Sequence, residues 1–293
     1  MLLSEFEFRV AQFLGVSVAI VRDPTAPLTA PAPDRVQLRH TKAVKREDLT
    51  AAMHAALAIA RAVGRNLRDR GPSESPPSDA LAWRTEMLRS ERIPTLETVL
   101  DDLWSRRIAV AQVEELPAPK FKALACMADA RPIILLGHSN DAPSLPLFDI
   151  AHECGHLANG DCQEGRIVLD ATDEPDTAQM ELAADVYAFR LLDGEDQPIE
   201  LTSGSPSNLA SQAAYLGSQE KVDPGHLLMS WARSRATDEA YTKAQMALRS
   251  LWKQDKGARS MLAAAFAKNV NLDGASESDY ALLSCVNGGR VAE

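Results

Sequence analysis

The feature that most constrains this chain is the stretch Ala151-His152-Glu153-Cys154-Gly155-His156-Leu157. Its H-E-x-x-H pattern has a chemical meaning only on a helix. At about 3.6 residues per turn, His152 and His156 lie one turn apart on one face, so both imidazoles can reach one zinc ion. Glu153 lies at the edge of that face, where its carboxylate can reach a metal-bound water. Apolar residues on both sides of the motif favour this site over a surface helix with two solvated histidines.

A catalytic zinc ion takes three protein ligands and keeps one position for water, so a third ligand is expected downstream. The segment Glu181-Leu182-Ala183-Ala184-Asp185 supplies an E-x-x-x-D pattern on a second predicted helix. Glu181 is the predicted third ligand, and Asp185, one turn later, is predicted to hydrogen-bond a ligand histidine. Cys154 lies about 200° around the helix from His152 and is predicted to be a small core residue. We therefore expect one Zn²⁺ per chain.

Length and charge narrow the class of protein. A chain of 293 residues fits one large or two modest domains. The net charge of −10 argues against a surface that follows nucleic-acid phosphates. We expect no membrane span and no signal peptide, because no run approaches about 18 apolar residues and the N-terminus lacks a basic region. The four scattered cysteines are typical of reduced thiols in a cytoplasmic protein. The sequence does not indicate an oligomeric state.

Residues 79–200 are predicted to form a zincin-like catalytic domain of the α+β class. Two helices come first, at 80–91 and after the capping residue Thr95. Three apolar runs then predict the strands of a small sheet: 108–113, 121–127 and 132–136. The sheet leads into the motif helix, at about 145–159, and the Glu181 helix follows at 177–192 with Gly194 just beyond its end.

Mainly helical additions are expected on both sides of this domain. The N-terminal segment, 1–78, is predicted to hold two short helices at 4–14 and 17–21, a long Ala-rich helix at 47–69 and two Pro-rich linkers. The short pair is either a docking element or a degenerate helix-turn-helix. The C-terminal region, 201–293, predicts five further helices: 207–216, 224–235, 238–254, 257–268 and 277–285.

Three stretches together resemble the ImmA/IrrE family of metallo-endopeptidases. They are the apolar strand 132–136, the motif helix 147–157, and the segment 181–192. The chain departs from the family pattern at three positions, where it has Asp149 for a small residue, Ala183 for a second Glu, and Asp185 for Asn. None of these three positions is one of the predicted metal ligands. The resemblance covers about residues 80–235.

The resemblance implies regulated proteolysis in the bacterial cytoplasm. Members of the family typically cleave a helix-turn-helix repressor encoded nearby and so induce stress, phage-defence or mobile-element genes. Some members carry a helix-turn-helix segment of their own, and residues 1–23 are a candidate for a degenerate version. The expected partner is thus a protein substrate, and direct nucleic-acid binding stays open.

The expected mechanism is that of a zinc endopeptidase. His152, His156 and Glu181 hold the metal, and Glu153 takes a proton from the attacking water. An oxyanion donor is also required, and Tyr187 and His226 are both candidates between which the sequence does not decide.

Two other functions compete with site-specific proteolysis. A DNA-associated regulator could use the zinc site for structure or sensing, and it should then bind DNA through residues 1–70. A broad-specificity cytosolic peptidase should degrade casein or a generic peptide panel.

Overall fold

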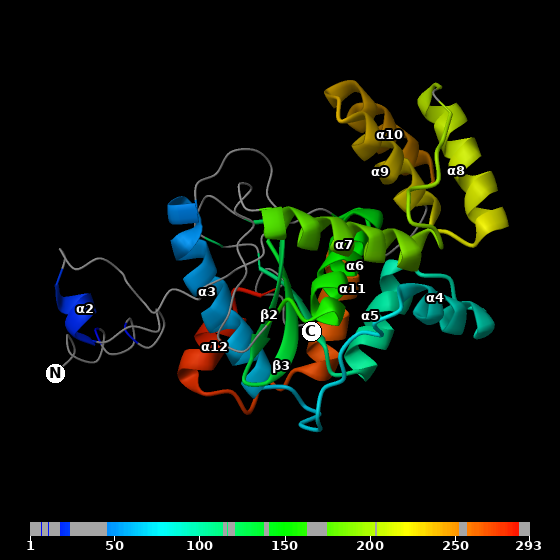
Figure 1. Ribbon diagram of the computed structural model, residues 1–293. Helices are drawn as coiled ribbons and strands as arrows, with labels where there is room; N and C mark the ends of the chain where they lie inside the picture. Colours follow the sequence, from blue (N-terminus) through cyan, green and yellow to red (C-terminus); the bar gives the residue numbers. More distant parts are fainter. Residues whose placement is uncertain are drawn as a thin grey trace.

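The structure, a computed structural model, describes residues 7, 11, 18–23, 46–113, 116, 121–137, 141–162, 175–202, 204–251 and 257–286. It is a mixed α and β fold in which helices surround one small sheet (Figure 1). A short helix, α2, spans Val18–Arg22, close to the predicted one at 17–21. Of the predicted helix at 4–14, the structure describes only residues 7 and 11, and both are helical. The first Pro-rich linker and most of the segment between the motif helix and the Glu181 helix lie outside the described residues.

The sheet consists of β1 (Ala109–Gln112), β2 (Ala123–Ala128) and β3 (Arg131–Leu136), in the order β1-β3-β2. β3 pairs in parallel with β1 and antiparallel with β2. Asp129 and Ala130 join β2 to β3, and both have positive φ, 53° and 58°. Such a two-residue turn matches the right-handed twist of a hairpin. All three strands lie within two residues of the predicted ranges.

Helices cover both faces of the sheet. α3 (Arg46–Arg65) packs on β2 and β3 from one side, and α12 (Glu277–Leu283) packs against α3. α6 (Ser144–Asn159) covers the opposite side (Figure 1). α5 (Leu96–Ser105) and α11 (Ala258–Asn269) contact β1. A sheet buried on both faces needs apolar residues at successive positions, which explains the continuous apolar runs of β2 and β3.

The apolar core extends across the domain boundaries at 78/79 and 200/201 that the sequence predicts. One continuous apolar core includes the sheet, α3, α11 and α12. The inner face of α3 is rich in alanine, at Ala52, Ala56 and Ala60, so the helix lies close against the sheet. Composition and proline-rich linkers mark where the chain changes character, but they do not indicate which helices return to a shared core.

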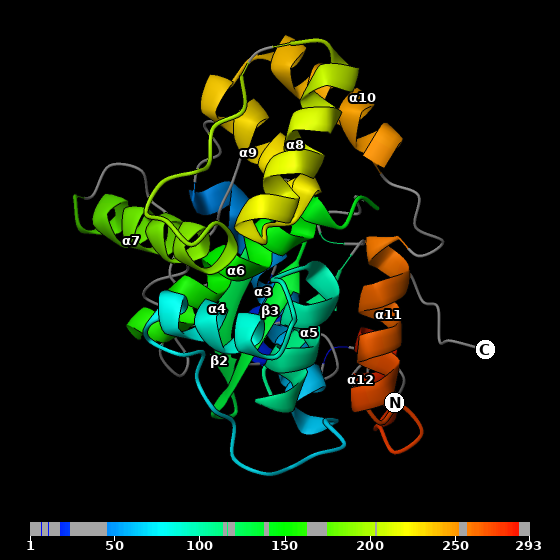
Figure 2. The same ribbon diagram turned by 90° about the vertical axis from the view of Figure 1, so that its right-hand side faces the viewer.

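A second apolar cluster belongs to α8 (Pro206–Glu220), α9 (Pro224–Arg235) and α10 (Asp238–Leu251). These three helices stand together on the side of α6 away from α12 (Figure 2). Asp223 caps α9 by accepting a hydrogen bond from the backbone N–H of His226, and Pro224 occupies the first turn. The C-terminal region is therefore split between this three-helix unit and the main core.

The motif helix α6 packs closely on α7 (Pro175–Leu192). Gly155 makes this possible, because a Cβ atom there would lie 2.9 Å from the Cα atom of Ala184. Gly194, with φ +82°, follows the end of α7 in the left-handed region, as predicted. The two helices that carry the predicted metal ligands are thereby held side by side.

Arg84 ties α7 to α8. It lies on α4 (Ala80–Arg89), is 5 % exposed, and donates hydrogen bonds to four backbone carbonyl oxygens. Two of these belong to the end of α7, at Leu191 and Leu192, and two to the end of α8, at Glu220 and Lys221. The positive charge thus satisfies carbonyl groups that helix ends leave without partners and complements both helix dipoles.

Replacing Arg84 by methionine should lower the free energy of unfolding by roughly 2–4 kcal/mol, because buried carbonyl oxygens lose charged donors. Urea unfolding followed by circular dichroism measures the change. Arg89, exposed on the same helix, provides the control, and R89M should cost little. Equal stabilities for the two variants would show that the contact contributes nothing.

Candidate metal centre

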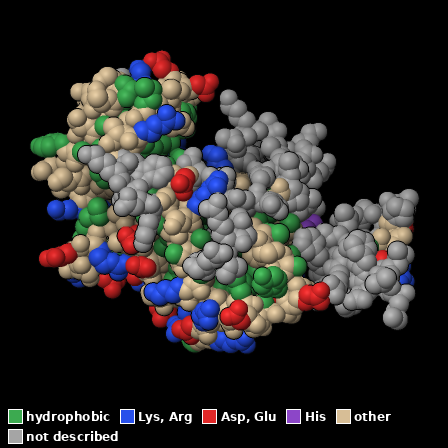
Figure 3. All heavy atoms as spheres, turned by 180° about the vertical axis from the view of Figure 1, so that it is seen from behind, with side chains coloured by type: hydrophobic (Ala, Val, Ile, Leu, Met, Phe, Trp, Pro, Cys, Tyr) green, Lys and Arg blue, Asp and Glu red, His purple; other side chains and the backbone are tan. Residues whose placement is uncertain are grey.

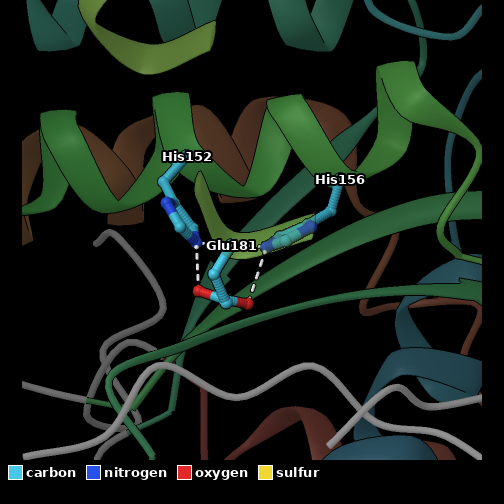
Figure 4. A group of neighbouring side chains, drawn as sticks. All are labelled: His152, His156 and Glu181. Atoms are coloured by element: carbon cyan, nitrogen blue, oxygen red, sulfur yellow. Dashed lines mark hydrogen bonds and ion pairs between the residues drawn. The ribbon is translucent and has the colours of Figure 1, made fainter. Parts of the chain in front are cut away.

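Three side chains from two helices converge at one point (Figure 4). His152 and His156 project from successive turns of α6, and Glu181 reaches them from α7. The Nε2 atoms of the two histidines lie 3.1 Å apart. Each Nε2 is 3.2 Å from a different carboxylate oxygen of Glu181. This group could hold a metal ion, and its members are the three ligands that the sequence predicts.

A carboxylate group lies beside the Nδ1 atom of each of the two histidines. Asp185 Oδ1 lies 2.9 Å from His152 Nδ1, the contact that its spacing from Glu181 predicts. Asp161 Oδ2 lies 2.9 Å from His156 Nδ1. When both imidazoles are neutral and each Nδ1–H donates a hydrogen bond to the neighbouring carboxylate, both Nε2 atoms become acceptors. Three acceptors then face one another, an arrangement that a bound cation stabilises.

Asp161 belongs to neither of the two sequence patterns that predict the site. α6 ends at Asn159, and the following Gly160, with φ +76°, turns the chain back. The N–H of Asp161 then donates to the carbonyl oxygen of His156. This reversal brings the carboxylate beside the ring five residues earlier. The available signal was an acidic residue directly after a glycine at the predicted end of the motif helix.

Hydrogen bonds within the cluster shift the pKa values of His156 and Glu181. Burial alone would lower the pKa of His156, but its hydrogen bonds to Asp161 and Glu181 outweigh burial and raise that pKa to about 9. Burial would raise the pKa of Glu181, yet the hydrogen bonds from the two histidines hold that pKa well below its ordinary value. Glu181 is therefore ionised over the physiological range, as a metal ligand must be.

Glu153 is 1 % exposed and lies next to His152 on α6. Burial raises the pKa of this carboxyl group and outweighs the charges of His156 and His152, which act in the opposite direction. Within the described part of the chain, its Oε2 atom has no hydrogen-bond partner. A buried carboxyl group with a raised pKa and an open acceptor has the properties of a general base.

The two candidates for the oxyanion donor are engaged elsewhere. The hydroxyl of Tyr187 donates to the carbonyl oxygen of Pro77 at 2.7 Å, so it joins α7 to the segment before α4. His226 is fully buried, and its Nε2 lies 3.0 Å from Oδ2 of Asp193. Neither side chain belongs to the three-residue group. Their roles in this structure are to fix α7 and α9 in place.

Cys154 lies in the core, as predicted, with no exposed surface. Burial raises the pKa of its thiol, which disfavours the thiolate form that binds metals. The other three cysteines are also free thiols.

Comparisons with protein-family models, curated proteins and solved structures gave no match to this chain. Among the described helices, none is both long and apolar enough to cross a membrane.

Removing either outer carboxylate should weaken metal binding. Asp185→Ala and Asp161→Ala should each lower the affinity for Zn²⁺ by about 10–100-fold, because each aspartate orients a ligand histidine. Competition with a chromophoric chelator measures the affinity. Asp196 pairs with Arg190 on the surface, so D196A should bind Zn²⁺ like the wild type. Unchanged affinity in both D185A and D161A would contradict the orienting role.

Proposed function

We propose that this protein is a zinc-dependent endopeptidase with a zincin-like catalytic unit. The convergence of His152, His156 and Glu181 beside the buried Glu153 carries the proposal. In a tetrahedral zinc site with bonds of about 2.0–2.2 Å, ligand atoms lie about 3.3–3.6 Å apart. The separations of 3.1 Å and 3.2 Å in this cluster are close to those values. Two histidines and one glutamate also match the ligand set of peptidases such as thermolysin.

Each residue then has a role. His152, His156 and Glu181 would hold a zinc ion, which would lower the pKa of a water molecule and polarise the scissile carbonyl. Glu153 accepts the proton of the attacking water and delivers it to the leaving amine. Asp185 and Asp161 keep the two imidazoles in the tautomer that presents Nε2 to the site.

The edge of the sheet offers a place for substrate. Among the described strands, β2 lies at the edge, and it packs against α6. The carbonyl oxygen of Lys122 accepts from the N–H of Gly137. The antiparallel alternation therefore directs the N–H and C=O groups of Ala123, Ala125 and Met127 away from β3. An extended segment of substrate can pair with the groups of Ala123 and Met127, whereas the carbonyl oxygen of Ala125 already accepts a hydrogen bond from the thiol of Cys162.

The proposed substrate is a helix-turn-helix repressor, and the proposed compartment is the bacterial cytoplasm. Both rest on the resemblance of the motif helix and the Glu181 segment to the ImmA/IrrE family. The charge distribution also favours a protein substrate over DNA. On the face drawn in Figure 3, acidic and basic side chains of the described residues are interspersed and offer no continuous basic surface to phosphates.

The test uses the zinc-loaded full chain, the repressor encoded beside its gene, and casein as a generic unfolded protein. Cleavage of the repressor at one site, with casein left intact, supports the proposal. Rapid digestion of casein points instead to a broad-specificity peptidase. Binding of operator DNA without cleavage of either protein points to a regulator with a structural or sensory zinc site.

A further inference from the structure

A cavity of about 360 Å³ lies at the junction between the main core and the three-helix unit. Residues at the start of α5, α6 and α11 line it from the main core, and α9 and α10 line it from the three-helix unit, which stands above them in Figure 2. Pockets that bind small molecules usually have volumes of about 300–1,000 Å³. None of the described residues that line this cavity belongs to the candidate metal centre, so it is a separate site.

Apolar side chains form most of the described wall of the cavity. They come from α5, α9, α10, α11 and the residue before α6: Leu96, Pro224, Leu248, Leu251, Met261 and Pro143. Such a wall favours a ligand with an apolar or aromatic body, because burial removes the apolar surface of both from water. The polar groups of the wall then determine which head group the ligand carries.

One of these polar groups is a hydroxyl without a partner. Ser144 lines the cavity and is only 3 % exposed, yet its Oγ atom makes no hydrogen bond in the part of the chain that the structure describes. Ser144 is the first residue of α6, and no side chain caps this end of the helix, because Pro143 occupies the N-cap position. A buried polar group left without a hydrogen bond destabilises the fold, so a ligand that bonds to Ser144 would remove this penalty.

A carboxylate group lies close to this hydroxyl. Asp223, the N-cap residue of α9, also lines the cavity. A Cβ atom built on Gly225 would lie 3.0 Å from Cβ of Ser144 and 3.1 Å from Oδ1 of Asp223. These two atoms are therefore no farther apart than the sum of the two distances, a separation that one polar group hydrogen-bonded to both side chains can span.

The charges at the cavity favour a cationic head group. The described wall contains two carboxylates, Asp223 and Glu97, and neither lysine nor arginine. The N-termini of α5, α6 and α9 oppose the carboxylates with about half a positive charge each, which two full negative charges outweigh. Burial also raises the pKa of Asp223, so a nearby cation would stabilise its ionised form. A primary ammonium group has three donors and can therefore bond to Asp223 and Ser144 together.

We propose that this cavity binds a small primary amine with an apolar or aromatic body, whose ammonium group hydrogen-bonds to Ser144 and Asp223. The site is additional to the metal centre and does not depend on the proposed peptidase function. An occupant would contact both α9 and the first turn of α6, the helix that carries His152 and His156. It would thereby join the motif helix to the three-helix unit.

The test compares three probes that share a phenyl ring and a two-carbon arm: 2-phenylethylamine, 2-phenylethanol and 3-phenylpropionate. Isothermal titration of the full chain should give a dissociation constant about 10-fold lower for the amine than for the alcohol, because only the amine carries a charge opposite to that of Asp223. The carboxylate should bind most weakly. The methyl NMR resonance of Met261, assigned by its absence in M261L, should shift when the amine enters the cavity. H152A should bind the amine like the wild type, which separates this site from coordination to a metal ion.

Two variants remove the polar groups one at a time. S144A should weaken binding of the amine about 10-fold without lowering the stability of the fold, because the hydroxyl has no partner to lose. D223N should abolish the preference for the amine over the alcohol and still cap α9, since Asn caps helices as well as Asp. Ser218 on α8 and Asp238 on α10 are exposed residues of the same types. The controls S218A and D238N should bind all three probes like the wild type.

An undetectable affinity for the amine, or tighter binding of the alcohol or the carboxylate, would overturn the inference. An unchanged preference in D223N would do so as well, because the charge of Asp223 would then play no part. Binding that leaves the Met261 resonance in place, or that disappears in H152A, would locate the amine elsewhere and reject this cavity as its site. If S144A does not fold, the wild-type probe series and D223N still decide the outcome.

Discussion

Replacing His152 or Glu181 by alanine should leave the chain without bound zinc. Purified wild-type protein should contain about one zinc ion per chain, because three ligands converge from α6 and α7. Removing one ligand leaves two, and a two-ligand site in water should not retain the ion through dialysis against a chelator. Metal content measured by atomic emission, set against protein concentration, gives the occupancy directly.

The controls are residues of the same types outside the cluster. His54, on α3, and Glu86, exposed on α4, are far along the chain from the motif. H54A and E86A should keep full occupancy. Full occupancy in both H152A and E181A would remove the metal site from this cluster. The proposed function would then fail along with it.

Short-range spacing explains why the ligands could be predicted from the sequence. His152 and His156 are four residues apart, and so are Glu181 and Asp185, so a helix alone decides which side chains share a face. The apolar residues on both sides of the H-E-x-x-H motif then indicate that α6 is buried. Strands β2 and β3 were equally accessible to prediction, because each is a short apolar run and only a two-residue turn separates them.

The remaining features depend on contacts between distant segments. Tyr187 lies on the same helix as Glu181, but the carbonyl oxygen of Pro77, from a separate segment, is its hydrogen-bond partner. His226 lies in the first turn of α9, and only the tertiary fold places Asp193 beside it. Asp161 belongs to no periodic pattern, since a reversal of the backbone after α6 determines its position. Sequence spacing therefore located the candidate metal ligands and Asp185, but not Asp161 or the partners of Tyr187 and His226.

The second prediction separates chemistry from metal binding. Glu153→Gln should abolish cleavage of the repressor that the wild type cuts, by at least about 10²–10⁴-fold, because glutamine cannot accept the water proton. The substitution keeps the size of the side chain, and Glu153 is not one of the three ligands. Zinc content should therefore stay at the wild-type level. Rates follow from the loss of intact repressor on gels.

The stability of E153Q tests a second consequence of the burial of Glu153. Burial raises the pKa of Glu153 in the folded chain above its value in the unfolded chain. An acid shifted in this direction lowers the stability of the fold at pH values above its unfolded pKa, and increasingly so until the pH passes its folded pKa. A neutral glutamine avoids this cost, so E153Q should be at least as stable as the wild type at pH 7. The control E86Q, exposed on α4, should keep both activity and stability. Undiminished cleavage by E153Q would remove Glu153 from the mechanism, whereas lost zinc or a lower melting temperature would show that its role is structural.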